Sequence, residues 1–194
     1  MFSGIVETTS PILKIEDSKD QRKFLVRKPR GWKLKAGESV SIEGVCSTVQ
    51  RVNREAFEVI YMPETLRRTT LGDFRPREHV NLERSLTLQS LIGGHLVQGH
   101  VDTTARIRKI HGDGSARIFE FQLPARFSRY LVEKGSVAVD GVSLTVTGVH
   151  PGRFQVSLLE YTLRHTTLGR KGPGGRVNIE LDILAKYVEN LLTR

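Results

Sequence analysis

The chain has 194 residues, of which 38% are hydrophobic and 26% charged, and its formal net charge is +9. This composition is typical of a soluble globular protein, because no apolar run approaches the roughly 20 residues of a membrane span and the N-terminus lacks the basic and apolar regions of a signal peptide. The single cysteine excludes an internal disulfide framework and indicates a cytoplasmic protein, and the scattered histidines form no metal-ligand cluster.

The basic charge is compatible with two kinds of surface. A concentrated positive field attracts nucleic acid or another polyanion, whereas dispersed charge simply keeps a protein in solution. The densest basic clusters lie at residues 19–23 and 27–30, and the other charges are scattered. No regular interleaving of aromatic and basic residues offers a stacking platform for single strands. We therefore predict a solvated basic surface, with neither nucleic acid nor a membrane as partner.

Short alternating segments dominate both halves of the chain. They are residues 39–42, 48–52, 57–61, 136–139, 145–149 and 154–158. Period-two alternation rich in Val, Ile, Thr and Phe is typical of half-buried strands. Turn residues such as Glu43-Gly44 and Asp140-Gly141 separate these segments. Many short strands with frequent turns predict closed antiparallel barrels, which hide the strand edges.

Helices are expected at three places. Residues 63–68 begin with a proline at a plausible first helical position. Residues 124–133 would place Phe127, Tyr130 and Leu131 on one side.

The clearest helix is the C-terminal one, at residues 183–192, with Asp182 as its N-cap. Its apolar stripe consists of Leu184, Val188, Leu191 and Leu192, opposite the polar residues Lys186, Glu189 and Asn190. Such a stripe needs a cover, which is either the helix's own barrel or copies of the helix from other subunits.

The strongest feature is an internal repeat. Gly44-Val45-Cys46-Ser47-Thr48-Val49 aligns with Gly141-Val142-Ser143-Leu144-Thr145-Val146 at a shift of 97. About 18 of the 40 positions from residue 44 to residue 83 are identical in the second copy without a gap, which indicates a duplication.

The start of the chain is repeated too, at a slightly different shift. Residues 4–9 align with residues 99–104 at a shift of 95, so the second copy begins near Gln98 and carries a two-residue insertion between Ile110 and Lys134. Ile5 in the first copy corresponds to His100 in the second. We predict two domains, residues 1–97 and 98–182, followed by a helix at 183–194.

Cys46 is the chemical difference inside the repeat, because the second copy has Ser143. Free cysteines are most often small buried hydrophobes, and that interpretation competes with a reactive role. Thr48 lies two residues further along the same strand, so it should share the face of Cys46. Two similar scaffolds that differ in one reactive atom suggest divided roles.

Two histidines lie among glycines in Gly93-Gly94-His95-Leu96-Val97-Gln98-Gly99-His100. They are either structural residues of a linker or a general acid and base next to a substrate. His100 is the better candidate because it interrupts the repeat. Thr65 and Thr162, repeated after a strand end, are either helix caps or hydrogen-bonding groups for the edge of a planar heterocycle.

Five motifs together resemble the riboflavin synthases, a family with a duplicated lumazine-binding domain. The motifs are Met1 to Glu7, Met62 to Gly72, Gly94 to Asp102, Lys134 to Val146 and Val177 to Glu180. The resemblance covers nearly the whole chain, in order and with the right spacing.

The resemblance implies two six-stranded antiparallel β-barrels in tandem and a homotrimer held together by the C-terminal helix. It also implies a dismutation without cofactor or metal. A four-carbon unit passes from one 6,7-dimethyl-8-ribityllumazine to another, which gives riboflavin and 5-amino-6-ribitylaminouracil. In the family, one substrate lies in the N-terminal barrel and the other in the C-terminal barrel of a neighbouring subunit. Holding two rings in reacting geometry supplies much of the barrier reduction.

The resemblance also implies roles for single residues. His100 is the candidate proton carrier, Cys46 and Ser39 orient or stabilise the adduct or activate a nucleophile, and Phe2 closes the pocket. The residues expected to contact the two substrates are Gly4, Ile5, Val6, Cys46, Ser47, Thr48, Ile60, Tyr61, Met62, Pro63, Glu64, Thr65, Gly99, His100, Val101, Lys134, Ser143, Leu144, Thr145, Leu159, Glu160, Tyr161, Thr162 and Leu163.

The chain departs from the family pattern in several places. Glu43 replaces an asparagine before Gly44, and Ser47 stands where leucine is common, so we expect a lost core contact in the first barrel. Residues 159–162 replace an Ile-Pro-His-Thr-like segment, and Asp102-Thr103 replaces Asp-Gly.

Two other functions fit the same fold class. One is a non-catalytic carrier of lumazine or flavin, which would be expected to lose the Cys and His that this chain keeps. The other is a basic β-barrel that binds nucleic acid, because fold alone does not determine function.

Overall fold

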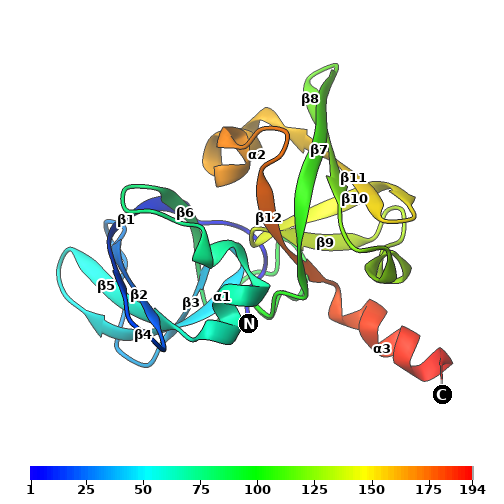
Figure 1. Cartoon of the computed structure of the whole chain (residues 1–194). Coiled ribbons are helices and arrows are strands. Elements are labelled where there is room, and N and C mark those ends of the chain that lie inside the picture. Colours follow the sequence, from blue (N-terminus) through cyan, green and yellow to red (C-terminus); the bar gives the residue numbers. More distant parts are fainter. Residues whose placement is uncertain (194) are drawn as a thin grey trace.

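Twelve strands form two closed antiparallel barrels of six strands each in the computed structural model of the chain, which describes residues 1–193 (Figure 1). The strands of the first barrel are β1 (Thr8–Asp17), β2 (Arg22–Arg27), β3 (Ser39–Ile42), β4 (Val45–Val52), β5 (Ala56–Tyr61) and β6 (His79–Arg84). Those of the second are β7 (Thr103–Asp113), β8 (Ala116–Gln122), β9 (Ser136–Val139), β10 (Val142–His150), β11 (Arg153–Leu159) and β12 (Arg176–Leu181). The predicted fold class is therefore confirmed.

The two barrels share one topology, as the repeat predicts. The neighbour order is β1-β2-β5-β4-β3-β6 in the first barrel and β7-β8-β11-β10-β9-β12, read from its first strand, in the second. Even the irregularities recur, because the pairing of β1 with β2 shifts register after Ile12 and that of β7 with β8 shifts after Ile107. The predicted insertion lies in the connection between β8 and β9 (residues 123–135), which is two residues longer than residues 28–38 between β2 and β3.

Each barrel is filled by the inward side chains of its alternating strands. In β4, Val45, Ser47 and Val49 are buried, whereas Cys46 and Thr48 point outward. Aromatic rings pack at the centres, with Phe24 edge-on to Tyr61 at 5.1 Å in the first barrel. Each fully buried aliphatic or phenyl side chain contributes about 1.5–3 kcal/mol relative to an exposed one, so the packed cores stabilise the barrels that carry groups on their outer faces.

Two short helices follow equivalent strands, α1 (Pro63–Arg68) after β5 and α2 (Glu160–His165) after β11. The prediction of α1 is confirmed. The interpretation of Thr65 and Thr162 as helix caps is wrong, because Met62 and Leu159 hold the N-cap positions. The two threonines lie inside the helices, and their carbonyl groups accept hydrogen bonds from Thr69 and Thr166 hydroxyls.

Three 3₁₀ turns complete the connections, η1 (Thr70–Gly72), η2 (Ala125–Tyr130) and η3 (Thr167–Arg170). The predicted α-helix at residues 124–133 is wrong in type and length. Phe127 N bonds to Pro124 O and Leu131 N bonds to Ser128 O, which is the 3₁₀ spacing. Leu131 is nevertheless buried against the second core, as expected for its side of the segment.

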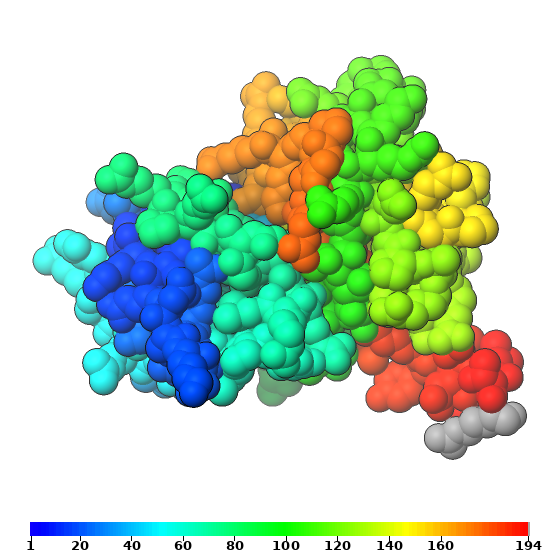
Figure 2. All heavy atoms as spheres, in the orientation of Figure 1, coloured from blue at the N-terminus to red at the C-terminus, as the bar shows by residue number. Residues whose placement is uncertain are grey.

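The C-terminal helix α3 (Ile183–Leu192) confirms the predicted range and its N-cap, since Asp182 Oδ1 accepts from Leu184 N at 3.0 Å. Its polar side faces the second barrel, where Lys186 pairs with Asp102 at 2.7 Å and Glu189 with Arg129 at 3.0 Å. The apolar stripe points away from the barrel. The exposed fractions of its residues are 64% for Leu184, 56% for Val188, 72% for Leu191 and 79% for Leu192. Figure 2 shows α3 projecting beyond the body of the chain.

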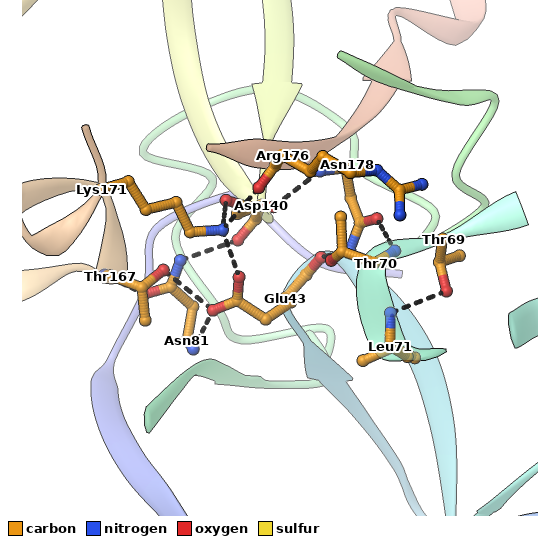
Figure 3. A network of polar contacts seen from close by, with 10 residues as sticks. All are labelled: Glu43, Thr69, Thr70, Leu71, Asn81, Asp140, Thr167, Lys171, Arg176 and Asn178. Atoms are coloured by element: carbon orange, nitrogen blue, oxygen red, sulfur yellow. Dashed lines mark hydrogen bonds and ion pairs between the residues drawn. The ribbon is translucent and has the colours of Figure 1, made fainter. Parts of the chain in front are cut away.

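A buried polar network joins the two barrels (Figure 3). Its members are Glu43, Thr70, Asn81, Asp140, Thr167, Lys171 and Asn178. Except for Lys171, they form pairs related by the repeat. The contacts also obey the repeat: Asn81 Nδ2 donates to the Asp140 carbonyl at 2.9 Å. In return, Asn178 Nδ2 donates to the Glu43 carbonyl at 2.8 Å.

Gly44 and Gly141 meet at the centre of this arrangement. A Cβ atom on Gly44 would lie 2.6 Å from Gly141 N, and one on Gly141 would lie 2.8 Å from Gly44 N. Both residues also have φ near +80°, in the left-handed region that favours glycine. The two barrels are thus related by an approximate twofold axis between these glycines, and their turns cannot slide apart without breaking the polar network.

The charges of the network are unequal, because two carboxylates share one lysine. Burial and the neighbouring Asp140 charge raise the pKa of Glu43 from 4.5 to about 7. Burial also raises the pKa of Asp140. Folded Glu43 therefore holds a proton between pH 4.5 and about 7, where the unfolded residue has lost it. The free energy of unfolding should fall as pH rises through this window.

We expect Glu43→Gln to flatten this pH dependence, because glutamine carries no titrating proton and its carbonyl oxygen can still accept from Asn81 N. Chemical unfolding followed at a series of pH values between 4.5 and 7.5 measures the slope. Glu55→Gln, at an exposed carboxylate, is the matched control and should keep the wild-type slope. An unchanged slope in Glu43→Gln would contradict the expected titration of Glu43.

Candidate functional site

The candidate site begins with two equivalent outer faces, one on each barrel. In the first, Ser39 pairs with Thr48 and Ser41 with Cys46 across β3 and β4. Cys46 is half-buried and Thr48 exposed, which confirms that they share one face. In the second barrel, Thr145 and Ser143 take the same places on β10, opposite Ser136 and Ala138 of β9.

A leading segment precedes the first strand of each barrel in the sequence, residues 1–7 before β1 and residues 98–102 before β7. A buried glutamate anchors each leading segment to its own barrel. Glu83 of β6 accepts from Ser3 N at 2.6 Å and from Gly4 N at 3.1 Å. Glu180 of β12 accepts from Gly99 N at 2.8 Å and from His100 N at 3.0 Å. Burial raises the pKa of both carboxyl groups. Backbone amides oppose this effect, those of Ser3 and Gly4 at Glu83 and those of Gln98 and Gly99 at Glu180.

The two leading segments then cross to the opposite barrel. Gly4 O accepts from Ser143 N at 2.7 Å, and Gly99 O accepts from Cys46 N at 2.9 Å. Gly99 must be glycine, because its φ is +81° and a Cβ atom there would lie 2.6 Å from Cys46 N. The exchange puts the segment that carries His100 beside Cys46 and the segment that carries Ile5 beside Ser143. Each outer face is thus completed by a piece of the other repeat.

The predicted site residues divide by burial. Those with side chains at least partly open to solvent are Ile5, Val6, Ser39, Cys46, Thr48, Ile60, Met62, Pro63, Glu64, Thr65, His100, Val101, Lys134, Ser143, Thr145, Leu159, Glu160, Tyr161 and Thr162. The side chains of Ser47, Tyr61, Leu144 and Leu163 point into the barrel cores. A ligand on the outer face would meet only the backbone of these four residues.

Ser47 fills its place in the first core, where the sequence predicted a lost contact. Its hydroxyl lies 2.8 Å from Tyr61 Oη, and both side chains are only 3% exposed. At the equivalent positions, the second barrel has Leu144 and Leu158. In the first barrel, the small Ser47 and the large Tyr61 together take the place of these two leucines. Burial raises the pKa of Tyr61, so its hydroxyl group keeps its proton. The expected loss of a core contact in the first barrel is therefore wrong.

Phe2 is fully buried and packs against Val97, Ala138 and Cys46. Phe2 N donates to Val97 O at 2.7 Å, which joins the N-terminus to the linker between the barrels (residues 85–102). The ring of Phe2 is closed off from solvent and packs in the same cluster as Cys46. Phe2 is therefore suited to positioning Cys46, and the role of closing a pocket stays a prediction.

A cavity of about 850 Å³ lies beside the first barrel. It brings Ser39 together with Ile5, and the linker residues Ser85 and Leu91 form part of its wall. Cys46 and His100 are not among the residues that line it. Ser39 therefore connects the cavity to the outer face, where it pairs with Thr48.

The departures at residues 159–162 lie at the start of α2. Glu160 accepts from Arg164 Nε at 2.9 Å, and Tyr161 stacks on His165 at 4.1 Å and is 72% exposed. These are contacts within one helical turn. Leu159, at the N-cap, is 59% exposed and keeps an apolar surface at the edge of the site.

Residues 1–193 contain no group of three or more His, Cys, Asp or Glu side chains that could hold a metal ion. In the same part of the chain, no helix combines the length and apolar character needed to cross a bilayer.

Comparison with known proteins agrees with the repeat. The lumazine binding domain model matches residues 3–85 and again residues 98–182. The riboflavin synthase of Mycobacterium tuberculosis (strain ATCC 25618 / H37Rv) is 43% identical over 197 residues, covering 99% of this chain and 98% of that protein. That of Escherichia coli (strain K12) is 39% identical over 197 residues, covering 100% of this chain and 92% of that protein.

Solved structures show the same fold. LumP complexed with riboflavin superposes with a TM-score of 0.86 at 21% identity, over 93% of this chain and 99% of that one. LumP complexed with 6,7-dimethyl-8-(1'-D-ribityl) lumazine has a TM-score of 0.83, also at 21% identity and over 93% of this chain and 98% of that one. At this identity the likeness concerns the fold alone.

Proposed function

The chain belongs to the lumazine-binding-domain family of riboflavin synthases, and we propose that it converts two molecules of 6,7-dimethyl-8-ribityllumazine into riboflavin and 5-amino-6-ribitylaminouracil. The observation that carries this proposal is the pair of equivalent outer faces, which differ at Cys46 and Ser143. Two identical substrates need two similar pockets, and their unequal roles as donor and acceptor need a chemical difference between them.

The reaction is a dismutation, so its balance needs no further reactant. The atoms of two substrate molecules equal those of the two products, because a four-carbon unit leaves one ring system and joins the other. The protein must bind both rings in reacting geometry, remove a proton from the acidic methyl group on C7 of one, and promote addition to the other.

We assign these tasks to the first outer face and the segment beside it. His100 is the proposed proton carrier, and its anchoring through Glu180 and Gly99 supports a fixed position next to Cys46. Cys46 and Ser39 are proposed to orient or stabilise the adduct, and Phe2 to hold Cys46 in place. The remaining predicted contact residues are proposed to bind the two ring systems.

The function is tested by incubating the purified protein with 6,7-dimethyl-8-ribityllumazine alone and following absorbance. We expect two lumazine molecules to disappear for each riboflavin formed, without added cofactor or metal. Tight binding of lumazine without riboflavin formation would contradict the proposal and indicate a carrier. The relatives at 39–43% identity, all riboflavin synthases by name, favour the enzyme over the carrier.

We further propose a cytoplasmic homotrimer in which domains 1–97 and 98–182 of neighbouring chains face each other and α3 forms the centre. Support comes from the exposed apolar stripe of α3, whose polar side is already occupied by Asp102 and Arg129. A single chain exposes Leu184 and Leu191 to water, and three copies packed together would bury them.

Deletion of residues 183–194 is therefore expected to yield monomers in analytical ultracentrifugation. A finer version compares Leu191→Lys with Asn190→Lys, which add the same charge to neighbouring exposed positions of α3. Only Leu191→Lys should dissociate the assembly, because it alone lies on the apolar stripe. A truncated chain that still sediments as a trimer would show that α3 does not hold the subunits together.

A further inference from the structure

One contact between the linker and the second barrel has no counterpart in the first. His95 Nδ1 lies 2.7 Å from Ser143 Oγ, and His95 N donates to Ser3 O at 3.1 Å. Gly94 packs so closely that a Cβ atom there would lie 2.6 Å from Ser143 Cβ and 2.7 Å from Ser143 Oγ. The linker thus packs against the side chain of Ser143, while Gly4 O accepts a hydrogen bond from Ser143 N.

The surroundings of the ring indicate which nitrogen carries the hydrogen. His95 Nε2 is buried and has no hydrogen-bond partner among residues 1–193. Burial lowers the pKa of His95, although Asp182 opposes this, so the ring is neutral at pH 7. Because buried N–H groups without acceptors are rare, the hydrogen is best placed on Nδ1, leaving Nε2 as a bare acceptor.

This assignment excludes His95 as the acceptor of the Ser143 hydroxyl hydrogen. If His95 Nδ1 donates to Ser143 Oγ, the hydroxyl hydrogen is left to point elsewhere. Among residues 1–193, Ser143 Oγ has no other hydrogen-bond partner. Ser143 lies on the outer face of β10 beside Thr145, so its free O–H is available to an acceptor atom of a ligand on that face.

The repeat makes the contact one-sided. Cys46, the counterpart of Ser143, has no imidazole bonded to its side chain in residues 1–193. Its surroundings are Phe2, Val97 and Ala138. The first face therefore presents a thiol that packs on apolar side chains, and the second presents a hydroxyl that accepts a hydrogen bond from His95.

We propose that His95 is a specificity-determining positioning residue, which holds the Ser143 hydroxyl as a hydrogen-bond donor toward an acceptor atom of the planar heterocycle bound on the second barrel. The inference rests on the proposed function and deepens it. Since both pockets receive the same molecule, a donor fixed in only one of them makes the two bound rings unequal before any reaction begins.

The experiment is an equilibrium titration with riboflavin, a ring system that does not turn over by itself, read by fluorescence. His95→Leu removes the donor, His95→Asn keeps an amide N–H close to the position of Nδ1, and Ser143→Ala removes the hydroxyl. We expect His95→Leu and Ser143→Ala each to weaken one class of sites about fivefold to tenfold and to leave the other class unchanged. The double variant should lose no more than either single variant, and His95→Asn should bind within about twofold of the wild type.

Additive losses in the double variant would overturn the proposal, since His95 and Ser143 would then act separately. Equal weakening of both classes of sites would overturn it too, because a general structural disturbance would explain the loss. So would unchanged binding in Ser143→Ala, a variant small enough to fold whatever happens to His95→Leu. Failure of the proposed function would show separately, as no riboflavin formed from lumazine by the wild type.

Discussion

Replacing Lys171 with methionine is expected to destabilise the protein by about 3–5 kcal/mol, the usual effect of removing one partner of a buried ion pair. Lys171 Nζ lies 2.6 Å from Asp140 Oδ2 and 3.4 Å from Glu43 Oε2, and both carboxylates are fully buried. Figure 3 shows the side chain of Lys171, the residue after η3, reaching toward the two acids. Methionine keeps the length of the aliphatic stem but leaves two buried carboxyl groups without a cation.

The pH dependence of this loss distinguishes charge from packing. The Lys171 charge lowers the pKa of Glu43 and of Asp140, against the larger effect of burial. Without the lysine both pKa values rise further, so the two acids must take up protons to remain buried. The destabilisation should therefore be larger at pH 8 than at pH 5, as measured by chemical unfolding at a fixed protein concentration.

Two further variants sharpen the test. Lys109→Met, at an exposed lysine of β7, should change the free energy of unfolding by less than about 0.5 kcal/mol. Adding Glu43→Gln and Asp140→Asn to Lys171→Met should recover much of the loss, because no buried charge then remains unpaired. If Lys171→Met were as stable as the wild type at pH 8, the lysine would not be what holds the acids in place.

The network was visible in the sequence only in part. Glu43 stood out as a departure from the family pattern, but nothing local indicated that it would be buried against Asp140 of the other barrel. The stronger sign was Asn81 and Asn178, since asparagine is disfavoured inside strands and yet both copies keep it. Lys171 could not be found from the repeat, because its counterpart is Phe74, which packs on the first barrel core.

The barrels were predictable because alternation and turn residues are local properties, and the duplication allowed one half to check the other. The helix α2 was not predicted, although its residues align with those of α1 at the shift of 97, so the repeat alone indicates it. The crossing of the leading segments was not predictable from local patterns. It depends on hydrogen bonds such as that between Cys46 N and Gly99 O, which join residues far apart in the chain.

His100→Gln is expected to lower kcat about 10²–10⁴-fold, the range typical of a lost general acid or base. The backbone of His100 is held by Glu180, so the substitution should not disturb the crossing segment. Glutamine keeps hydrogen-bonding capacity but cannot exchange a proton near neutral pH. Riboflavin affinity should therefore stay within a few-fold of the wild type, while formation of riboflavin from lumazine nearly stops. His111→Gln, at an exposed histidine of β7, is the matched control.

Exchange of the C7-methyl hydrogens of bound lumazine with deuterium isolates the proton-removal step from carbon transfer. If His100 carries the proton, His100→Gln should slow the enzyme-catalysed exchange as strongly as turnover. Cys46→Ser should slow turnover without unfolding the protein and leave exchange much less affected, because Cys46 is assigned to the adduct. A His100→Gln variant that exchanges at the wild-type rate would move proton removal to another group. The anchoring of residues 98–101 against Cys46 would then serve substrate binding alone.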